Sequence, residues 1–217
     1  MGSAQIFIET PEASILYSGD FKVSENLTTL PLEVRNADIL ITEATYGNPR
    51  YIFPQQEKTK EEFVKWVKSE IRKGNEVHVG AYPIGKSQEA IKILNEEGII
   101  PKVTETIRRY SEVYKKFGVK LEFTSEDSEV LIKPIGLIRN KEGVKNCILT
   151  GWTLYNEKGI FGFPISDHAD FLQILEYVEM VKPKIVYCFH GFEDILCKEI
   201  KKRLGIEARP INSFERV

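Results

Sequence analysis

Apolar and polar residues alternate along this chain with two different periods, which predicts a succession of strands and helices. Short apolar runs bounded by turn residues predict strands at residues 5–9, 14–18, 37–42, 76–80, 99–103, 130–132, 147–150 and 184–189. Apolar residues at helical spacing predict helices at residues 59–73, 87–97, 105–116, 170–181 and 193–204. Because strands and helices alternate from Thr59 to the end, we expect an α/β fold in which most strands pair in parallel.

Length and composition narrow the class of protein. A chain of 217 residues is long enough for one large domain or two small ones. The net charge of −2 gives no bulk basic character, so a nucleic-acid partner needs a local basic patch. No apolar run is long enough to cross a bilayer and the N-terminus lacks a signal-peptide pattern, so we expect a cytoplasmic protein without a membrane partner. Cys147, Cys188 and Cys197 lack metal-site spacing, which predicts reduced, buried thiols.

Residues 80–87 match the phosphate-loop pattern G-x-x-x-x-G-K-[ST], after a predicted strand and before a predicted helix. Three interpretations are open. The segment is a structural turn with a solvated Lys86, or it binds a nucleoside triphosphate, or Gly85, Lys86 and Ser87 contact a phosphate in another class of enzyme. A P-loop NTPase also needs an Asp after a later buried strand to hold Mg²⁺. The later predicted strands end in Gly-Trp and His-Gly pairs instead, which disfavours an NTPase.

Three further segments place an Asp or a His near the end of an apolar run, as metal and catalytic sites in α/β proteins do. They are residues 18–20 (Ser-Gly-Asp), 166–170 (Ser-Asp-His-Ala-Asp) and 189–191 (Phe-His-Gly). The chain has three histidines, and no two of them are close enough in sequence to chelate one ion. His78 lies inside a predicted strand, and we assign it no functional role.

Each candidate site residue also has a structural interpretation. Asp20 can cap a turn, and Glu43 at a strand end can be a solvent-facing carboxylate. His168 can lie at a helix N-terminus, where the neighbouring aspartates interact favourably with the helix dipole. His190 can be a core histidine. Taken one at a time, these structural interpretations are favoured, and only the joint order of the motifs reverses that preference.

Six motifs follow one another in an order that is typical of one family. They are residues 2–5 (GSAQ), 17–22 (YSGDFK), 42–47 (TEATYG), 82–86 (YPIGK), 166–170 (SDHAD) and 189–191 (FHG). With this order the chain resembles the β-CASP branch of the metallo-β-lactamase superfamily, the nucleases of DNA repair and RNA 3′-end processing. Within the branch it most resembles the prokaryotic ligase-associated or mRNA 3′-end-processing-factor-like exonucleases. The resemblance extends over essentially the whole chain.

The resemblance implies an architecture and an activity. Residues 1–48 and 160–217 would form a partial metallo-β-lactamase-like αββα sandwich, and residues 49–159 an inserted α/β β-CASP domain. The activity would be zinc-dependent hydrolysis of phosphodiester bonds in DNA or RNA, from an end of the strand. Two zinc ions suit this reaction because they generate hydroxide near neutral pH and neutralise charge on the phosphate.

The resemblance also implies roles for residues near the metal. Asp20 would be the carboxylate that bridges the two zinc ions, and His190 would be a zinc ligand. Glu43 would be the acidic residue that supports the ligands. His168 would protonate or stabilise the leaving oxygen, as a group with a pKa near the working pH can, and Asp167 or Asp170 would orient it. The substrate phosphate would be contacted by three residues at a helix start, Gly85, Lys86 and Ser87.

The chain departs from the family pattern at one place. The family's H-x-H-x-D-H cluster, and a further His just before the Gly-Ser-Ala segment, do not occur in the sequence. Asp20 and His190 alone are fewer ligands than the three that a catalytic zinc typically takes from protein. We therefore expect this chain alone to be inactive, with a missing N-terminal segment or a homo-oligomer completing it. The alternatives are a non-catalytic pseudo-nuclease that binds nucleic acid or a protein partner, and a P-loop nucleotide-binding protein.

Overall fold

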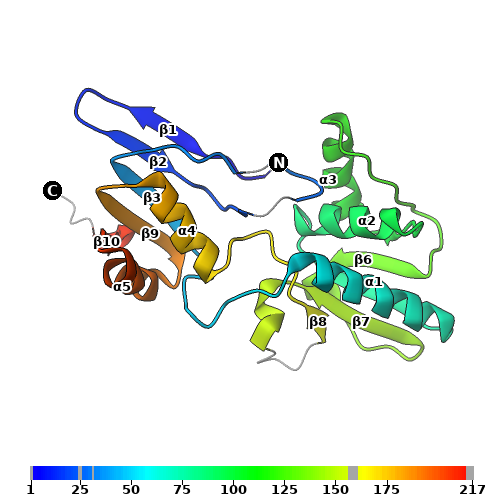
Figure 1. Ribbon diagram of the computed structural model, residues 1–217. Helices are drawn as coiled ribbons and strands as arrows, with labels where there is room; N and C mark the ends of the chain where they lie inside the picture. The colour runs from blue at the N-terminus through cyan, green and yellow to red at the C-terminus, as the bar shows by residue number, and fades with distance from the viewer. Residues whose placement is uncertain (1, 24–25, 31, 156–160, 214–217) are drawn as a thin grey trace. The chain divides into compact units, whose positions relative to one another are not determined.

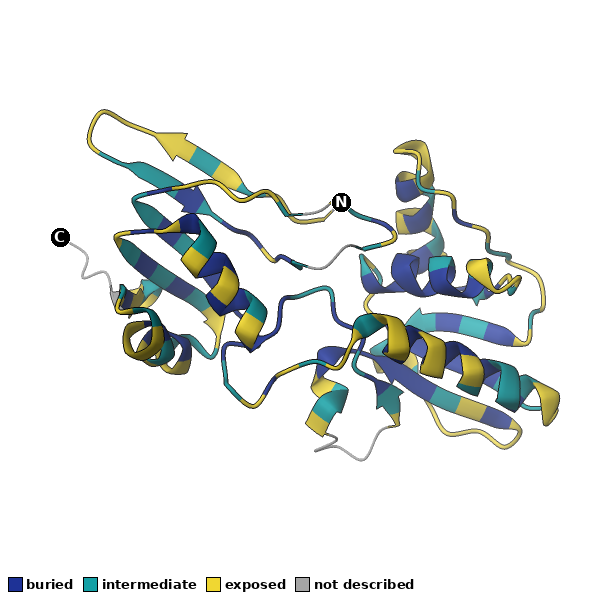
Figure 2. Cartoon of the chain, in the orientation of Figure 1, coloured by how far each residue is buried: buried dark blue, intermediate teal, exposed yellow. Residues whose placement is uncertain are grey.

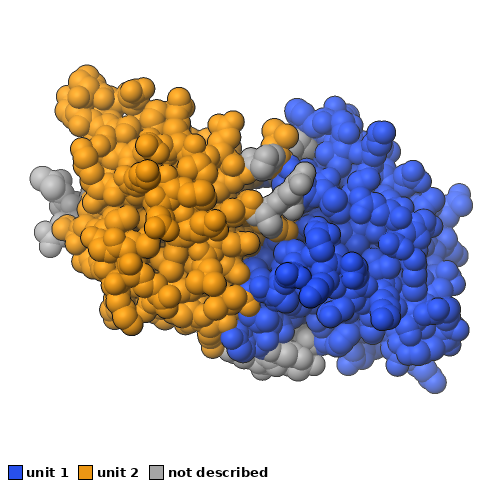
Figure 3. Space-filling view, in the orientation of Figure 1, with its two compact units in different colours: residues 1–2, 26–29, 53–166 blue, residues 3–25, 30–52, 167–217 orange. Residues whose placement is uncertain are grey.

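The computed structural model describes residues 2–23, 26–30, 32–155 and 161–213 (Figure 1). The chain divides into two compact units, and Figure 3 colours them separately. Unit 1 consists of residues 1–2, 26–29 and 53–166, and unit 2 of residues 3–25, 30–52 and 167–217. The family resemblance placed the two boundaries near residues 48 and 160, and residue 160 lies outside the described residues. Both units are α/β.

Unit 1 is built on a parallel sheet with strand order β5-β6-β4-β7-β8. Its strands are β4 (Glu76–Ala81), β5 (Lys102–Val103), β6 (Val130–Pro134), β7 (Val144–Leu149) and β8 (Gly162–Phe163). Its helices are α1 (Gln56–Arg72), α2 (Lys86–Glu96) and α3 (Glu105–Lys116), with short 3₁₀ turns at Ile135–Leu137 and Gly151–Tyr155. Apolar residues from all three helices and from one face of the sheet form one core cluster. The expected parallel pairing is therefore confirmed here.

Several sequence-based boundaries in unit 1 are shifted, and two of the shifts have a clear local reason. Helix α1 begins at Gln56 rather than Thr59, because its first turn is polar and adds nothing to the apolar period. The strand expected at residues 99–103 shrinks to β5. Ile99 instead closes the end of α2, since its N–H donates to the carbonyl of Leu94 at 3.0 Å.

Unit 2 is built on a mixed sheet with strand order β1-β2-β3-β9-β10. Its strands are β1 (Ile6–Glu9), β2 (Ser14–Tyr17), β3 (Ile39–Ala44), β9 (Ile185–Gly191) and β10 (Glu207–Pro210). Only β1 and β2 pair antiparallel, and the other neighbours pair in parallel. Helices α4 (Phe171–Val181) and α5 (Glu193–Leu204) and the 3₁₀ turn Ile211–Ser213 complete it. The short strands β8 and β10 are missing from the sequence-based prediction.

Helices α4 and α5 cover one face of this second sheet. That face carries Leu16, Leu40 and Val186, which are 2%, 0% and 0% exposed and pack in one cluster with residues of both helices. Figure 2 shows the resulting stripe on α4, dark blue where residues are buried and yellow where they are exposed. A helix with such a stripe packs by its apolar side and leaves its polar side in water.

Two predictions from composition are tested by the fold. Cys147, Cys188 and Cys197 are buried, free thiols, as expected. Among the described residues, no helix has both the length and the apolar character that a membrane crossing requires.

Candidate metal and catalytic site

The candidate site lies at the carboxyl ends of the central strands of unit 2. Strands β2, β3 and β9 run in parallel, so their carboxyl ends meet at one edge of the sheet. Asp20 follows β2, Glu43 lies near the end of β3, and His190 lies near the end of β9. His168 comes from the segment before α4. Open α/β sheets place ligand sites at this edge, because loops there converge without blocking the sheet.

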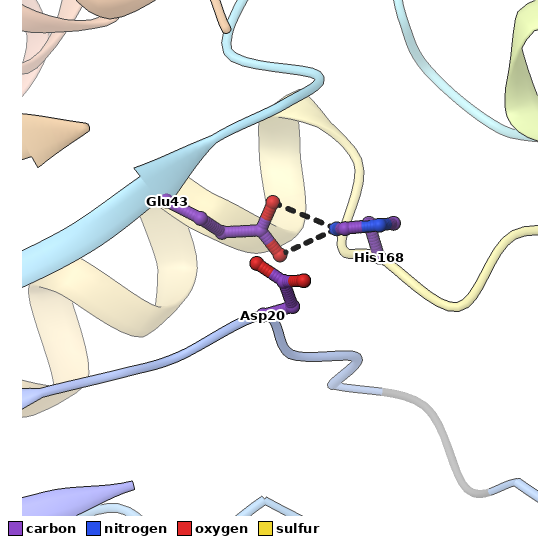
Figure 4. A group of neighbouring side chains, drawn as sticks. All are labelled: Asp20, Glu43 and His168. Carbon is purple, nitrogen blue, oxygen red and sulfur yellow. Dashed lines mark hydrogen bonds and ion pairs between the residues drawn. The ribbon is translucent and has the colours of Figure 1, made fainter. Parts of the chain in front are cut away.

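Glu43 is the centre of the hydrogen-bond network at this edge. Its side chain is 0% exposed, so the interpretation of a solvent-facing carboxylate is wrong. Nδ1 of His168 lies 2.8 Å from Oε2 and 3.0 Å from Oε1 of Glu43 (Figure 4). The backbone N–H of Phe21 donates to Oε1 at 2.9 Å. A buried carboxylate is stable only when donors surround it, and these contacts supply them.

The Ser-Gly-Asp loop is held in place on both sides of Asp20. The N–H of Ser18 donates to the carbonyl of Ile41 at 2.9 Å, which ties the loop to β3. Gly19 has φ +59°, and a Cβ there would lie 2.4 Å from Oγ of Ser3, so only glycine fits. Beyond Asp20, the carbonyl of Phe21 accepts from the N–H of Ala169 at 2.6 Å. The loop therefore carries the Asp20 carboxylate on a fixed backbone.

Asp20, Glu43 and His168 form one group in unit 2. One potential ligand atom from each lies within 4.8 Å of the others, and the Asp20 residue is exposed (Figure 4). Burial lowers the pKa of His168. The hydrogen bond to Glu43 and the charges of Glu43, Asp20 and Asp167 raise it, and the net pKa is raised. The protonated ring is therefore favoured by three carboxylates, against the cost of removing it from water.

The orientation of His168 differs from the sequence-based expectation. Glu43 hydrogen-bonds the His168 ring, while Asp167 contributes its negative charge. Asp170 is the N-cap of α4, and its side chain accepts from the N–H of Gln173 at 2.9 Å in a capping box. Asp170 is therefore explained by the helix start. The partner of His168 lies 125 positions away in sequence, so no local pattern could identify it.

His190 is the extra residue of a β-bulge. In the pairing of β3 with β9, Glu43 faces Phe189 and Ala44 faces Gly191, which leaves His190 between the two pairs. Its φ is +58°, and its N–H donates to Oε1 of Glu193 at 2.9 Å. His190 is exposed, so the interpretation as a core histidine is wrong. Bulges next to sites redirect a side chain, and this one places His190 at the edge that carries Glu43.

Gly85, Lys86 and Ser87 lie in unit 1, at the start of α2. Lys86 is 2% exposed and its Nζ donates to Oε2 of the fully buried Glu89 at 3.2 Å. The interpretation as a solvated lysine is therefore wrong. Oγ of Ser87 donates to the carbonyl of Tyr82 at 2.7 Å and closes the loop. These contacts give the loop a structural function, and its contact with a substrate phosphate stays a prediction.

Aromatic residues behind the site were not predicted from the sequence. The ring of Tyr177 on α4 packs against Phe21 at a centroid distance of 4.6 Å, and its hydroxyl accepts from Nε2 of Gln5 at 2.8 Å. Burial raises the pKa of Tyr177 to about 12. Tyr46 meets the His168 ring edge-on at 6.1 Å. In the sequence, Tyr177 occupies an apolar position of an amphipathic helix, so the pattern predicts only that it is a core residue.

The donor set of the site suits a metal ion in part. Carboxylate oxygen and imidazole nitrogen are ordinary zinc ligands. Both oxygens of Glu43 already accept hydrogen bonds, which suits a group that positions others. Asp20 and His190 are the exposed donors at this edge. The remaining histidine, His78, lies in unit 1, where its ring contacts Glu76 and Lys133.

Comparison with known proteins finds relatives whose names refer to DNA or RNA processing. No family model matches the sequence. The chain is 29% identical to a probable DNA ligase of Opitutus terrae, over 95% of this chain and 22% of that protein. It is 24% identical to an RNase J-like protein of Methanocaldococcus jannaschii, over 93% of this chain and 58% of that protein. It is 27% identical to the DNA cross-link repair protein SNM1 of Arabidopsis thaliana, over 77% of this chain and 42% of that protein.

The chain therefore spans between 22% and 58% of the length of these relatives. Among solved structures, a protein of unknown function from Enterococcus faecalis V583 superposes with a TM-score of 0.56 at 11% identity. That superposition covers 85% of this chain and 54% of the other. At this identity the likeness supports the α/β fold alone. Together with the ordered motifs, the sequence relatives confirm the resemblance: this chain is similar to nucleases of the β-CASP branch of the metallo-β-lactamase superfamily.

Proposed function

We propose that this chain carries the acid–base part of a phosphodiesterase site and belongs to an enzyme that cleaves DNA or RNA, acting from an end of the strand. The observation that carries the proposal is the contact between His168 and the fully buried Glu43, beside the exposed Asp20. The three groups meet at the sheet edge where α/β proteins bind ligands. The relatives include an RNase J-like protein and a DNA cross-link repair protein, which supports a nucleic-acid substrate.

The geometry suits His168 as a general acid. Glu43 accepts from Nδ1, which fixes the orientation of the ring, and we assign the proton transfer to the other ring nitrogen, Nε2. The raised pKa keeps a larger share of the ring protonated near neutral pH. Nε2 then donates its proton to the oxygen that leaves phosphorus, and the resulting neutral ring stays bound to Glu43. Proton donation by a positioned side chain contributes typically about 10²–10⁴-fold to a rate.

We also propose that the complete site binds zinc through Asp20 and His190. Bound zinc would supply hydroxide and neutralise charge on the phosphate. Asp20 is exposed at the end of a rigid loop, and the bulge brings His190 to the same edge. Further nitrogen ligands would have to come from outside these 217 residues, because His168 is bound to Glu43 and His78 lies in the core of unit 1.

The first experiment is zinc analysis together with cleavage of end-labelled single strands, with the protein assembled so that the further metal ligands are supplied. Cleavage that His168→Ala abolishes, with zinc bound to the protein, supports the proposal. His78→Ala is the matched control, since it removes a buried histidine from unit 1 and leaves unit 2 intact. If zinc-loaded protein cleaves equally well with and without His168, the assigned role of His168 is wrong.

A second candidate, a non-catalytic nucleic-acid-binding protein, follows from the same site. Unit 2 contains two of the three histidines, His168 and His190, which are few for two metal ions. This candidate predicts strand binding that weakens with salt, without bound zinc and without cleavage. Filter binding at two salt concentrations, together with the zinc analysis, separates it from the nuclease.

A further inference from the structure

Three polar side chains form a hydrogen-bonded chain on one face of the unit 1 sheet. Glu76 and His78 alternate along β4, and Lys133 lies on the neighbouring strand β6, two residues beyond the pairing of His78 with Leu131. Alternate residues of a strand share a face, so the register places all three on the face opposite the core cluster of unit 1. Nζ of Lys133 lies 2.9 Å from Nδ1 of His78, and Nε2 of His78 lies 2.6 Å from Oε1 of Glu76.

The two neighbours of His78 determine which ring nitrogen carries the hydrogen. A lysine ammonium has only donors, and a carboxylate has only acceptors. Nζ of Lys133 therefore donates to Nδ1 of His78, and Nε2 of His78 donates to Glu76. His78 is buried, so protein groups rather than bulk water surround its ring. His78, to which the sequence pattern assigns no function, is thus a neutral base in contact with an amine.

Lys133 is positioned to react as a free amine. It is half-buried, so it is accessible from solvent. Burial lowers the pKa of Lys133 and the charges of Arg139 and Lys141 lower it further, while the charge of Glu76 opposes them. Transfer of a proton from Nζ to Nδ1 of His78 frees the electron pair of the amine, and the carboxylate of Glu76 stabilises the imidazolium that forms. A nucleophile beside a base that a third group orients is the arrangement of an activated nucleophile.

We propose that Lys133 is a site of acylation, with His78 as the base and an acyl phosphate as the acyl donor. Nζ attacks the carbonyl carbon, a C–N bond forms, and the C–O bond to phosphate breaks with its electron pair on the leaving oxygen. Of the three ammonium protons, one stays on the amide, one ends on hydrogenphosphate, and one passes through His78 to water. The proposal does not depend on the nuclease activity, because it uses no residue of the unit 2 site.

The charges around Lys133 favour an anionic acyl donor. Arg139 and Lys141 are exposed, and their positive charges act on Lys133. A locally positive surface raises the concentration of anions next to it, and an acyl phosphate carries its negative charge directly beside the reacting carbonyl. Acylation converts the ammonium into a neutral amide, so it removes one of the three positive charges from this surface.

Treatment of the folded chain with acetyl phosphate, followed by peptide mass spectrometry, tests the proposal. Lys68 is the internal control, since its side chain is 42% exposed and its Nζ pairs with Glu97 rather than with a histidine. We expect Lys133 to be acetylated at least about tenfold faster than Lys68, because a positioned base accelerates proton transfer. In urea-unfolded chain the two rates should be equal. Equal rates in the folded chain, or a preference for Lys133 that persists after unfolding, overturn the proposal.

His78→Gln tests the base, because a glutamine oxygen can still accept from Nζ of Lys133 but cannot take up its proton. The variant should lower the acetylation rate of Lys133 at least about tenfold. The rate at Lys68 in the same sample should stay unchanged, which reports that unit 1 is folded. An undiminished rate at Lys133 in folded His78→Gln overturns the role of His78. If the variant does not fold, the wild-type comparison of Lys133 with Lys68 decides alone.

A second donor tests the choice of an acyl phosphate. An uncharged acetyl thioester carries the same acetyl group but is not attracted by Arg139 and Lys141. The preference for Lys133 over Lys68 should therefore be smaller with the thioester than with acetyl phosphate, and added salt should narrow the gap. Equal preferences with the two donors overturn the assignment of an anionic donor.

Discussion

Glu43→Gln tests whether a buried carboxylate controls the protonation of His168. Glutamine has nearly the shape of glutamate, so its carbonyl can still accept from the N–H of Phe21. The change removes the hydrogen bond and the charge that raise the pKa of His168, and it keeps the burial that lowers this pKa. The charges of Asp20 and Asp167, which also raise this pKa, remain in the variant. We therefore expect the pKa of His168 to fall.

The sign of the stability change follows from linkage. In the wild type the pKa of His168 is raised, so its contribution is fully present below the unfolded-state pKa and is lost as pH rises through the folded-state pKa. A hydrogen bond to a charged group contributes about 1.5–3 kcal/mol, and a neutral one about 1 kcal/mol. Glu43→Gln should therefore lower the free energy of unfolding by about 1 kcal/mol in mildly acidic solution, and by less in alkaline solution.

Two measurements check this prediction. NMR titration of the imidazole carbons gives the pKa of each of the three histidines, and His168→Ala assigns the relevant signal. Urea denaturation across the same pH range gives the free energy of unfolding. Glu193→Gln is the control, because Glu193 accepts from the backbone of His190 rather than from a ring. An unchanged or higher pKa of His168 in Glu43→Gln would refute the reasoning.

Three further predictions concern the scaffold. Gly191→Ala should destabilise the chain by about 2 kcal/mol or more, because φ is +106° and a Cβ would lie 2.4 Å from a carbonyl oxygen; Gly205→Ala, with open space around it, should cost about 1 kcal/mol in urea denaturation. Hydrogen bonds from a lysine and a serine lower the pKa of Asp38, so its contribution to stability is lost as pH falls below the unfolded-state value of 3.8. The Tm of Asp38→Asn should therefore fall less than the wild-type Tm in this pH range. Lys86→Met should lower the free energy of unfolding by about 3 kcal/mol, because it removes a cation that pairs with the buried Glu89. The double variant Lys86→Met/Glu89→Leu should recover most of this loss, as calorimetry can measure.

The sequence by itself determined the order and type of the longer elements. The helices at 105–116 and 193–204 have the predicted bounds, because amphipathic spacing and terminal residues are local signals. The strands that the sequence-based prediction missed also have a local explanation. Strand β8 has two residues, and β10 has a single buried residue, Ala208, among its four, so neither shows an apolar run. The order of the motifs also pointed to the relatives that the comparisons found.

Only the tertiary structure decided which residues act together. Glu43 and His168 are separated by 125 positions, and their contact depends on the path of the chain between them. The bulge at His190 arises from the pairing of β3 with β9, so it cannot be seen in either strand alone. From the sequence, one interpretation was a solvated Lys86, and packing around α2 buried it against Glu89. A sequence specifies side-chain chemistry and local period, whereas the partners of each side chain are set by strand register and helix packing.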